Sequence, residues 1–282
     1  MIKEKKVQLT LHGGNSLEFL RCLLESEIEW ESSCPKILDL SQVFFVTPIV
    51  CVWVKYFTIK NWKTLKPYSY EASQYLEWMN IYANQNYGDQ RYIPTFHLVD
   101  ASETNEVRKR LLDIFKNWMN KETREFLSYS ISELMENVFF HAKSEEGLVI
   151  HVQKYGAFDN RIEACIVDFG QGIANSMAEN PEFRERPEEQ RFIAGLTPRC
   201  TSKPGRHTGE GLSSVLEWIK QNDDAQGVII SQNCVWGKLK RKDEKWLKYN
   251  LPKWPGTLIW MSFPRDSRLS LNSVWEKLGF SL

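Results

Sequence analysis

The sequence lacks a net charge, a paired-cysteine motif and a long apolar run. Its 36 basic and 36 acidic residues balance, so no overall field attracts it to nucleic acid or to a membrane surface. The six cysteines include no CxxC pair, which is typical of reduced thiols, and the histidines show no metal-ligand spacing with them. The apolar stretch 43–54 contains Pro48 and is too short to cross a bilayer. Because residues 1–6 also lack a signal-peptide core, we expect a cytoplasmic protein without a membrane span.

The chain is long enough for two domains with separate cores, at 282 residues. A hydrophobic content of 42% excludes wholesale disorder. Residues 84–100 are polar, contain Gly and Pro, and show no sustained period, which indicates a connection between domains. We therefore predict a first domain at residues 1–88, a linker at 89–102 and a second domain at 103–282.

In the first domain, apolar alternation and turn residues predict strands that alternate with helices. The predicted strands are 6–12, 36–46 and 65–71, and the predicted helices are 16–30, 48–60 and 74–82. Ser16 can cap the first helix, and Pro48 suits the first turn of the second, after Thr47. This order of elements predicts a small α/β domain.

The second domain opens with two helical patterns that contain no internal Gly or Pro. The predicted helices are 103–118, 122–142 and 209–222, and the predicted strands are 148–155, 161–168, 227–232 and 257–263. Residues 156–160 are interpreted as a turn. Residues 173–207 carry four prolines and are interpreted as a mobile segment with a short helix near 188–194. The basic run 238–248 reads as a hairpin-like excursion, for which a solvated surface is preferred over a nucleic-acid site.

The most informative residues lie on the helix at 122–142. Glu133, Asn137 and His141 are spaced by four positions, so they share one helix face. An amide oxygen from Asn137 can complete the coordination of Mg²⁺ by phosphates and water. Glu133, one turn earlier, can accept a hydrogen bond from an attacking water. We expect His141 to pack or form hydrogen bonds, and Glu136 to face solvent.

Two glycine-rich motifs follow in the chain. Asp168 ends an apolar strand, where a buried carboxylate can accept a hydrogen bond from the exocyclic amine of adenine. Gly170 and Gly172 allow the backbone to approach a base and sugar closely. Gly209 and Gly211 expose backbone N–H groups at the start of a helix, which is a favourable site for phosphate.

The order Glu-x-x-x-Asn-x-x-x-His-Ala, Asp-x-Gly-x-Gly, Gly-x-Gly-Leu resembles the GHKL superfamily of DNA gyrase, heat-shock chaperone ATPases, MutL and histidine kinases. The resemblance covers about residues 103–282. It implies a Bergerat fold, an α/β sandwich with a mixed sheet, helices on one face and a lid at about 178–208. It implies ATP and Mg²⁺ as ligands, Glu133 as the catalytic base and Asn137 as the metal ligand. The implied ATP-binding residues are Asn137, Asp168, Gly170, Gly172, Gly209, Gly211, Leu212 and Thr257.

Further residues follow from the same resemblance. Gly256-Thr257 precedes the last predicted strand, and in the family a Thr at this point helps to recognise adenine through water. The lid contains Arg199, Lys203 and Arg206, any of which could contact phosphates when the lid closes. The choice among these three cations stays open.

Residues 37–50, ILDLSQVFFVTPIV, resemble the strand–loop–helix core of STAS domains of the anti-anti-sigma-factor type. The loop of those domains usually carries a phosphorylatable Ser followed by Gly-Leu. Here Ile49 and Val50 occupy those positions, and Thr47 is the nearest hydroxyl. The first domain is therefore expected to serve as an interaction or scaffolding unit.

Three functions fit these motifs. The first is a slow GHKL-type ATPase whose lid closure regulates a protein partner. The second is a protein kinase of the anti-sigma type, which phosphorylates Ser, Thr or His on a partner. The third is a module that binds ATP without hydrolysis and switches between open and closed lids. A homodimer is a further expectation by analogy with the family.

Overall fold

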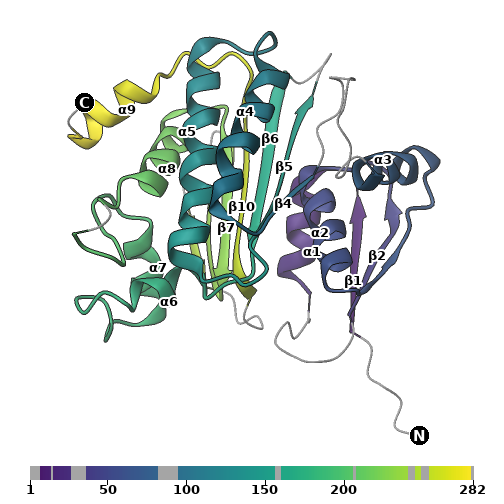
Figure 1. The fold of residues 1–282 in the computed structure, drawn as a ribbon, viewed down its shortest axis with the longest axis horizontal. Helices are drawn as coiled ribbons and strands as arrows, with labels where there is room; N and C mark the ends of the chain where they lie inside the picture. Colours follow the sequence, from purple (N-terminus) through teal and green to yellow (C-terminus); the bar gives the residue numbers. More distant parts are fainter. Residues whose placement is uncertain are drawn as a thin grey trace, which may run out of the picture.

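The computed structural model describes residues 7–13, 15–26, 36–81, 95–155, 160–205, 208–240, 245–248 and 254–280. Its described strands form two sheets (Figure 1). The smaller sheet has the order β1-β2-β3 and is parallel. The larger has the order β4-β5-β6-β10-β7-β8-β9, and all its neighbouring pairs are antiparallel. The fold is thus α/β, but the mixed sheet expected in the second domain is wrong.

The first part of the chain forms the small parallel sheet and its helices. Its elements are β1 (Val7–Gly13), α1 (Ser16–Leu24), β2 (Lys36–Val43), α2 (Pro48–Ile59), β3 (Lys63–Leu65) and α3 (Tyr70–Ile81). Thr47 is the N-cap of α2 and Pro48 lies in its first turn, as predicted. In contrast, Asn15 caps α1, because its side chain accepts a hydrogen bond from the Glu18 N–H at 3.1 Å. The third strand ends at Leu65, earlier than predicted.

The second part forms the large antiparallel sheet. Its elements are β4 (Phe96–Leu98), η2 (Ala101–Glu103), α4 (Thr104–Phe115), α5 (Lys121–Asn137), η3 (Val138–Ala142), β5 (Leu148–Tyr155), β6 (Arg161–Asp168), α6 (Gly172–Met177), α7 (Glu188–Gly195), α8 (Gly211–Gln221), β7 (Gln226–Gln232), β8 (Cys234–Lys238), β9 (Lys245–Lys248), β10 (Trp254–Pro264) and α9 (Leu271–Leu278). The predicted bounds of β5 and β6 are confirmed. Residues 96–98, placed in the linker, instead form the edge strand β4. Linker residues 89–94 and turn residues 156–159 lie outside the described part.

Helices cover both faces of the large sheet: those of the second domain pack on one face, as expected, and α1 and α2 of the first part of the chain cover the other. Figure 1 shows α4 and α5 on one side and α1 and α2 on the other. On the first side Phe126 stacks on Trp218 with ring centroids 3.7 Å apart. On the second side α2 shares one buried cluster with strand residues such as Val167 and Leu258. Residues 164–167 are all buried, because side chains of both orientations meet a covering layer.

A polar network also joins the first part of the chain to the large sheet. Ser16 at the start of α1 donates a hydrogen bond from Oγ to Glu163 Oε2 at 2.6 Å. Tyr155 and Trp260 donate to the same oxygen at 3.3 Å. Burial raises the pKa of Glu163, and these hydrogen bonds act in the opposite direction. The described residues on either side of the predicted domain boundary are therefore packed together.

The basic run at 238–248 is partly structural. The Lys238 side chain is buried, and its Nζ donates to the carbonyls of Asn222 and Ala225 at 2.6 and 2.8 Å. Lys240 pairs with Asp224 at 2.9 Å. Strands β8 and β9 form an antiparallel hairpin, while residues 241–244 lie outside the described part. None of the helices that the structure describes combines the length and apolarity needed to span a membrane.

The shared cluster predicts cooperative unfolding. Leu258 on β10 is fully buried on the side that α2 covers. Leu258→Ala should lower the free energy of unfolding by about 2–4 kcal/mol, because the cavity removes contacts between the sheet and the layer that contains α2. Denaturant titration followed by Trp fluorescence and far-UV circular dichroism should give one coincident transition, shifted as a whole. Two separate transitions, of which the variant shifts only one, would contradict the shared core.

Candidate functional site

A pocket of about 990 Å³, open to solvent, lies between α5, α6, the start of α8 and the ends of β6 and β10. Every predicted site residue except Gly170 lines it. These residues are Glu133, Asn137, Asp168, Gly172, Gly209, Gly211, Leu212 and Thr257. Residues as far apart in the sequence as Glu133 and Thr257 are thus brought to one cavity.

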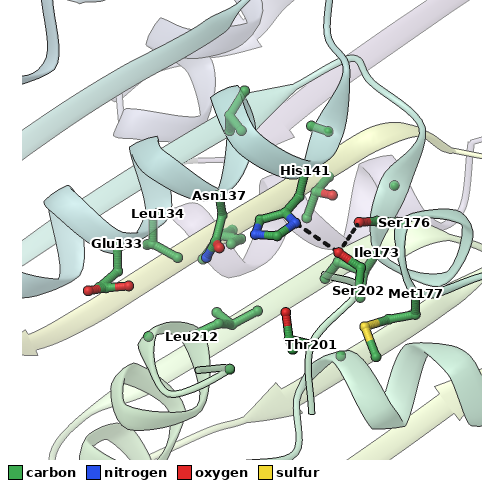
Figure 2. Close-up of a pocket in the computed structure, with 18 of the residues that line it drawn as sticks. Glu133, Leu134, Asn137, His141, Ile173, Ser176, Met177, Thr201, Ser202 and Leu212 are labelled. Atoms are coloured by element: carbon green, nitrogen blue, oxygen red, sulfur yellow. Dashed lines mark hydrogen bonds between the residues drawn. The ribbon is translucent and has the colours of Figure 1, made fainter. Parts of the chain in front are cut away.

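The polar row on α5 lies along the pocket. Figure 2 shows Glu133, Asn137 and His141 in sequence along one helical wall. The helix was expected to stay α-helical to Ala142, but it changes at Asn137 into a π-helical turn, Val138–Ala142, that ends at left-handed Lys143 with φ of 53°. A π turn adds a residue to the turn, and such turns often occur at functional sites. Glu136 is exposed, as predicted.

Glu133 lies against the first turn of α8. A Cβ atom at position 211 would overlap the Glu133 carboxylate, so Gly211 is required for this close packing. Burial, and secondarily the charge of Glu136, raise the pKa of Glu133 to about 7. The carboxyl group therefore titrates near neutral pH, beside the free N–H groups at the helix N-terminus.

Asp168 lies in a row of polar residues that crosses three strands. On β10 Thr257 pairs with Asp168 of β6 on one side and with Ser231 of β7 on the other. Ser231 Oγ accepts a hydrogen bond from the Ile173 N–H at 2.9 Å and donates to the Gly256 carbonyl at 3.1 Å. The antiparallel register, together with this serine, fixes the strand ends and the start of α6 at the base of the pocket.

The Asp168 carboxyl group is only 5% exposed. Burial raises its pKa to about 7, although hydrogen bonds from Gly170 and Thr257 favour the charged form. The Gly170 N–H donates to Oδ1 at 2.9 Å. A buried carboxyl group in the wall of a cavity is well placed to bind a ligand that donates hydrogen bonds.

Gly170 has a packing role. A Cβ atom there would overlap the Ala142 carbonyl, so only glycine allows the turn to approach the end of η3. Gln171 completes this junction, because its backbone N–H donates to the Ala142 carbonyl at 2.7 Å and its side chain to the His141 carbonyl at 2.8 Å. The turn after β6 and the end of the α5 wall are thus joined directly.

The lid segment 178–208 contacts the wall of the pocket through Ser202, and also through the charged residues Lys203 and Glu179. His141 Nδ1 and Ser202 Oγ share a hydrogen bond of 2.8 Å, and Ser176 Oγ donates to Ser202 Oγ at 3.2 Å (Figure 2). Thr201 and Ser202 line the cavity. The expected hydrogen-bonding role of His141 is confirmed.

The lid cations contact other groups. Arg199 Nη2 donates to the Gly279 carbonyl at 2.6 Å, and its guanidinium lies 5.5 Å from the Phe280 ring centroid. Lys203 Nζ donates to the Phe140 carbonyl. Arg206 lies outside the described residues. In the described part of the chain the pocket lining contains carboxyl groups but neither Lys nor Arg.

Sequence reasoning missed several lining residues. They are Ile166, Ile173, Ser176, Met177, Cys200, Thr201, Ser202, Thr208, Glu210 and Ile259, among others. The isoleucines of β6 and β10 could have been identified from strand alternation, since they share a face with Asp168 and Thr257. The serines carry no motif. Only the folded chain brings Ser176 and Ser202 together.

Comparison of the chain with models of known protein families gave no match, and comparison with curated proteins gave none. The resemblances to GHKL and STAS domains therefore stay predictions. Among the residues described, no group of three or more His, Cys, Asp or Glu side chains is arranged to hold a metal ion. A cation here would need ligands from a bound molecule as well as from the protein.

The raised pKa of Asp168 predicts a pH-dependent stability. Its unfolded pKa is about 3.9, so a folded pKa of about 7 makes the protonated form the stabilising one. This contribution is present in full below about pH 4 and is lost as pH rises through about 7. Asp168→Asn keeps an acceptor oxygen without the charge. From pH 4 to 8 the wild type should lose roughly 2–4 kcal/mol relative to this variant.

Denaturant unfolding of both proteins at several pH values measures this difference. Glu133 also has a raised pKa, but it is present in both proteins, so its contribution cancels in the comparison. A difference between the two proteins that stays constant across the range would contradict the buried, protonated Asp168.

Proposed function

We propose that the pocket binds ATP with Mg²⁺ and that the chain is a slow ATPase of the GHKL type, whose lid closure regulates a partner protein. One observation carries the proposal. The buried Asp168 carboxyl group pairs across the strands with Thr257, and Glu133 lies against Gly211 at the start of α8; all four residues and Asn137 line the same cavity. A buried acceptor and a helix N-terminus, the groups suited to a base and to phosphate, thus line one pocket, and this supports the proposal.

The adenine part rests on Asp168. The exocyclic amine of adenine donates hydrogen bonds, and a buried carboxylate can accept one. The desolvation penalty on the carboxylate is small at binding, because folding has already removed this group from water. Ile166 and Ile259 provide apolar walls beside it. Guanine presents a carbonyl where adenine presents this amine, so Asp168 should discriminate between the two bases.

Phosphate binding in this pocket would combine backbone N–H donors with a metal ion. Gly211 begins α8, whose first N–H groups lack helical partners and attract anions. Glu133, Asp168 and Glu210 bring negative charge to the lining, with no Lys or Arg among its described members. A polyphosphate in this surrounding requires a counter-ion. Asn137 directs its side chain at the cavity, which fits a single protein ligand for Mg²⁺ (Figure 2).

Glu133 supplies the group for hydrolysis. When bound, Mg²⁺ would neutralise phosphate charge and orient the terminal phosphoryl group. The Glu133 carboxylate would hold a water molecule by accepting its hydrogen bond, and would take its proton as that water attacks. Only the ionised carboxylate can do this. Because its pKa is about 7, activity should increase as pH rises through neutrality.

The first part of the chain is proposed to be a scaffold. Thr47, the nearest hydroxyl to the position where STAS domains carry a phosphorylatable Ser, is 1% exposed. It forms the N-cap position of α2 at the interior of the fold. A kinase could not reach this hydroxyl without unfolding of the helix start, so a phosphorylation switch at Thr47 is disfavoured.

Nucleotide binding is tested by calorimetric titration of Mg-ADP and Mg-ATP into the folded protein. Asp168→Asn should weaken binding by about 1–3 kcal/mol, or roughly 5–150-fold, because an amide cannot match the carboxylate as acceptor. Asp224→Asn, a carboxyl change far from the pocket, serves as the control. In the wild type, affinity should rise between pH 6 and 8 as Asp168 ionises. Absence of heat with both nucleotides would reject the proposal.

Hydrolysis is tested by phosphate release from Mg-ATP. Glu133→Gln should retain nucleotide affinity and lose at least about tenfold in rate, as expected for removal of a general base. Glu136→Gln is the matched control on the exposed face. It should stay active, with its pH midpoint lowered, because the charge of Glu136 contributes to the raised pKa of Glu133.

Equal rates for wild type and Glu133→Gln would reject the hydrolytic part of the proposal. Binding without phosphate release would then support a nucleotide-gated module. Transfer of labelled phosphate to a protein would support the kinase.

A further inference from the structure

Helix α2 of the first part of the chain lies behind the pocket, on the opposite face of the large sheet (Figure 1). Near its C-terminal end, Trp53, Tyr56 and Lys60 contact the sheet and its loops. Trp53 and Tyr56 contact segments that also supply pocket residues, and Lys60 contacts the loop that follows the wall carrying Asn137 and His141. The helix is therefore positioned to affect the site without lining it.

The most direct contact is between Tyr56 and Phe169. Their rings are stacked with centroids 3.4 Å apart and an interplanar angle of 10°. Phe169 immediately follows Asp168, and successive side chains of a strand point to opposite faces. Asp168 therefore lines the pocket while Phe169 contacts α2. One peptide bond joins the two residues, so the packing of Phe169 against Tyr56 also restrains the backbone that carries the Asp168 carboxyl group.

A second contact reaches the loop that follows the π turn. Lys60 forms an ion pair with Glu146, and each side chain is 29% exposed. In the same loop Ser144 Oγ accepts a hydrogen bond from the Phe169 N–H at 3.4 Å and donates to the Gly147 carbonyl at 2.7 Å. This loop connects the wall that carries Asn137 and His141 to β5. Tyr56 and Lys60 thus hold both turns that border the pocket.

A third contact reaches β10. Trp53 packs edge-on against Trp254 with centroids 5.1 Å apart, and against Phe169 at 6.5 Å. Trp254 precedes Thr257 by three residues on the strand that pairs with Asp168. One helix thereby packs against the segments bearing both of the residues assigned to adenine.

We propose that Tyr56 and Phe169 are positioning residues, and that α2 sets the nucleotide affinity of the site by fixing the orientation of Asp168 through their stacked rings. This inference rests on the proposed function, since it concerns the same pocket. It gives the first part of the chain a defined role. Whatever binds this unit and shifts α2 changes the affinity of the site for adenine nucleotide.

The test compares two adjacent residues of α2. Tyr56→Leu removes the ring that stacks on Phe169. Phe57→Leu removes a buried ring that packs edge-on against Trp53, Trp62 and Tyr56 itself, whereas the stack on Phe169 is made by Tyr56. Titration of Mg-ADP at a temperature where both variants are folded should show a loss of affinity of about tenfold for Tyr56→Leu and a change of less than about twofold for Phe57→Leu. Tyr56→Phe, which keeps the ring, should restore affinity to within about twofold of wild type.

A pH profile separates positioning from loss of stability. Tyr56→Leu should shift the pH midpoint of nucleotide binding, because moving Asp168 changes both the burial that raises its pKa and the hydrogen bonds that lower it. Phe57→Leu should keep the wild-type midpoint even when its melting temperature falls. If Tyr56→Leu does not fold, Phe169→Leu tests the same contact from the other side and should give the same loss of affinity.

The outcomes distinguish this inference from the proposed function. A wild-type protein that binds no Mg-ADP overturns both. A wild-type protein that binds, with Tyr56→Leu or Phe169→Leu binding equally well, overturns the positioning role alone. Equal losses in Tyr56→Leu and Phe57→Leu also overturn it, because the effect would then follow core packing in general.

Discussion

The site depends on one buried carboxyl group at the end of a central strand. Asp168 is held between β5 and β10 by the antiparallel register, and it has almost no contact with solvent. An ionised carboxylate is strongly disfavoured in such surroundings unless donors compensate it. Gly170 and Thr257 provide part of that compensation. The rest of the compensation comes either from a proton on the carboxyl group or from a ligand that donates a hydrogen bond. The state of Asp168 therefore depends on both pH and ligand.

The apolar character of the sheet on both faces explains why the first part of the chain packs where it does. A sheet with one polar face needs helices on one side only, whereas residues 164–167 are buried on both sides. The parallel sheet and its helices cover the second face, and α2 lies in the shared cluster. Because successive side chains of a strand point to opposite faces, a residue that lines the pocket is adjacent in the chain to one that contacts the layer behind the sheet. The packing that stabilises the sheet therefore also contacts the strands that border the pocket.

The sequence predicted the elements whose signals are local. Strands β5 and β6 have the predicted bounds because each is rich in apolar residues and begins directly after a turn residue, Gly147 or Asn160. The motifs around Asn137 and Gly211 were brought to one pocket, as their spacing indicated. Strand β4 was missed, because three residues at a sheet edge carry no periodic pattern of their own. The π turn and the covered second face depend on tertiary contacts, which no local pattern encodes.

The charged residues of the lid are a second case in which tertiary contacts could not be predicted from the sequence. From sequence, Arg199, Lys203 and Arg206 were candidates for phosphate contact on lid closure, with the choice among them open. In the folded chain Arg199 and Lys203 each donate to a backbone carbonyl, at the end of α9 and in the π turn respectively. Ser202 forms a hydrogen bond with His141, and Glu179 of the lid forms an ion pair with Lys143 at the end of the π turn. In the described part of the chain the pocket lining contains no Lys or Arg that could neutralise a polyphosphate. Binding of such a ligand must therefore bring a metal ion with it, or release a lid cation from its carbonyl, and both requirements make lid position respond to the charge in the pocket.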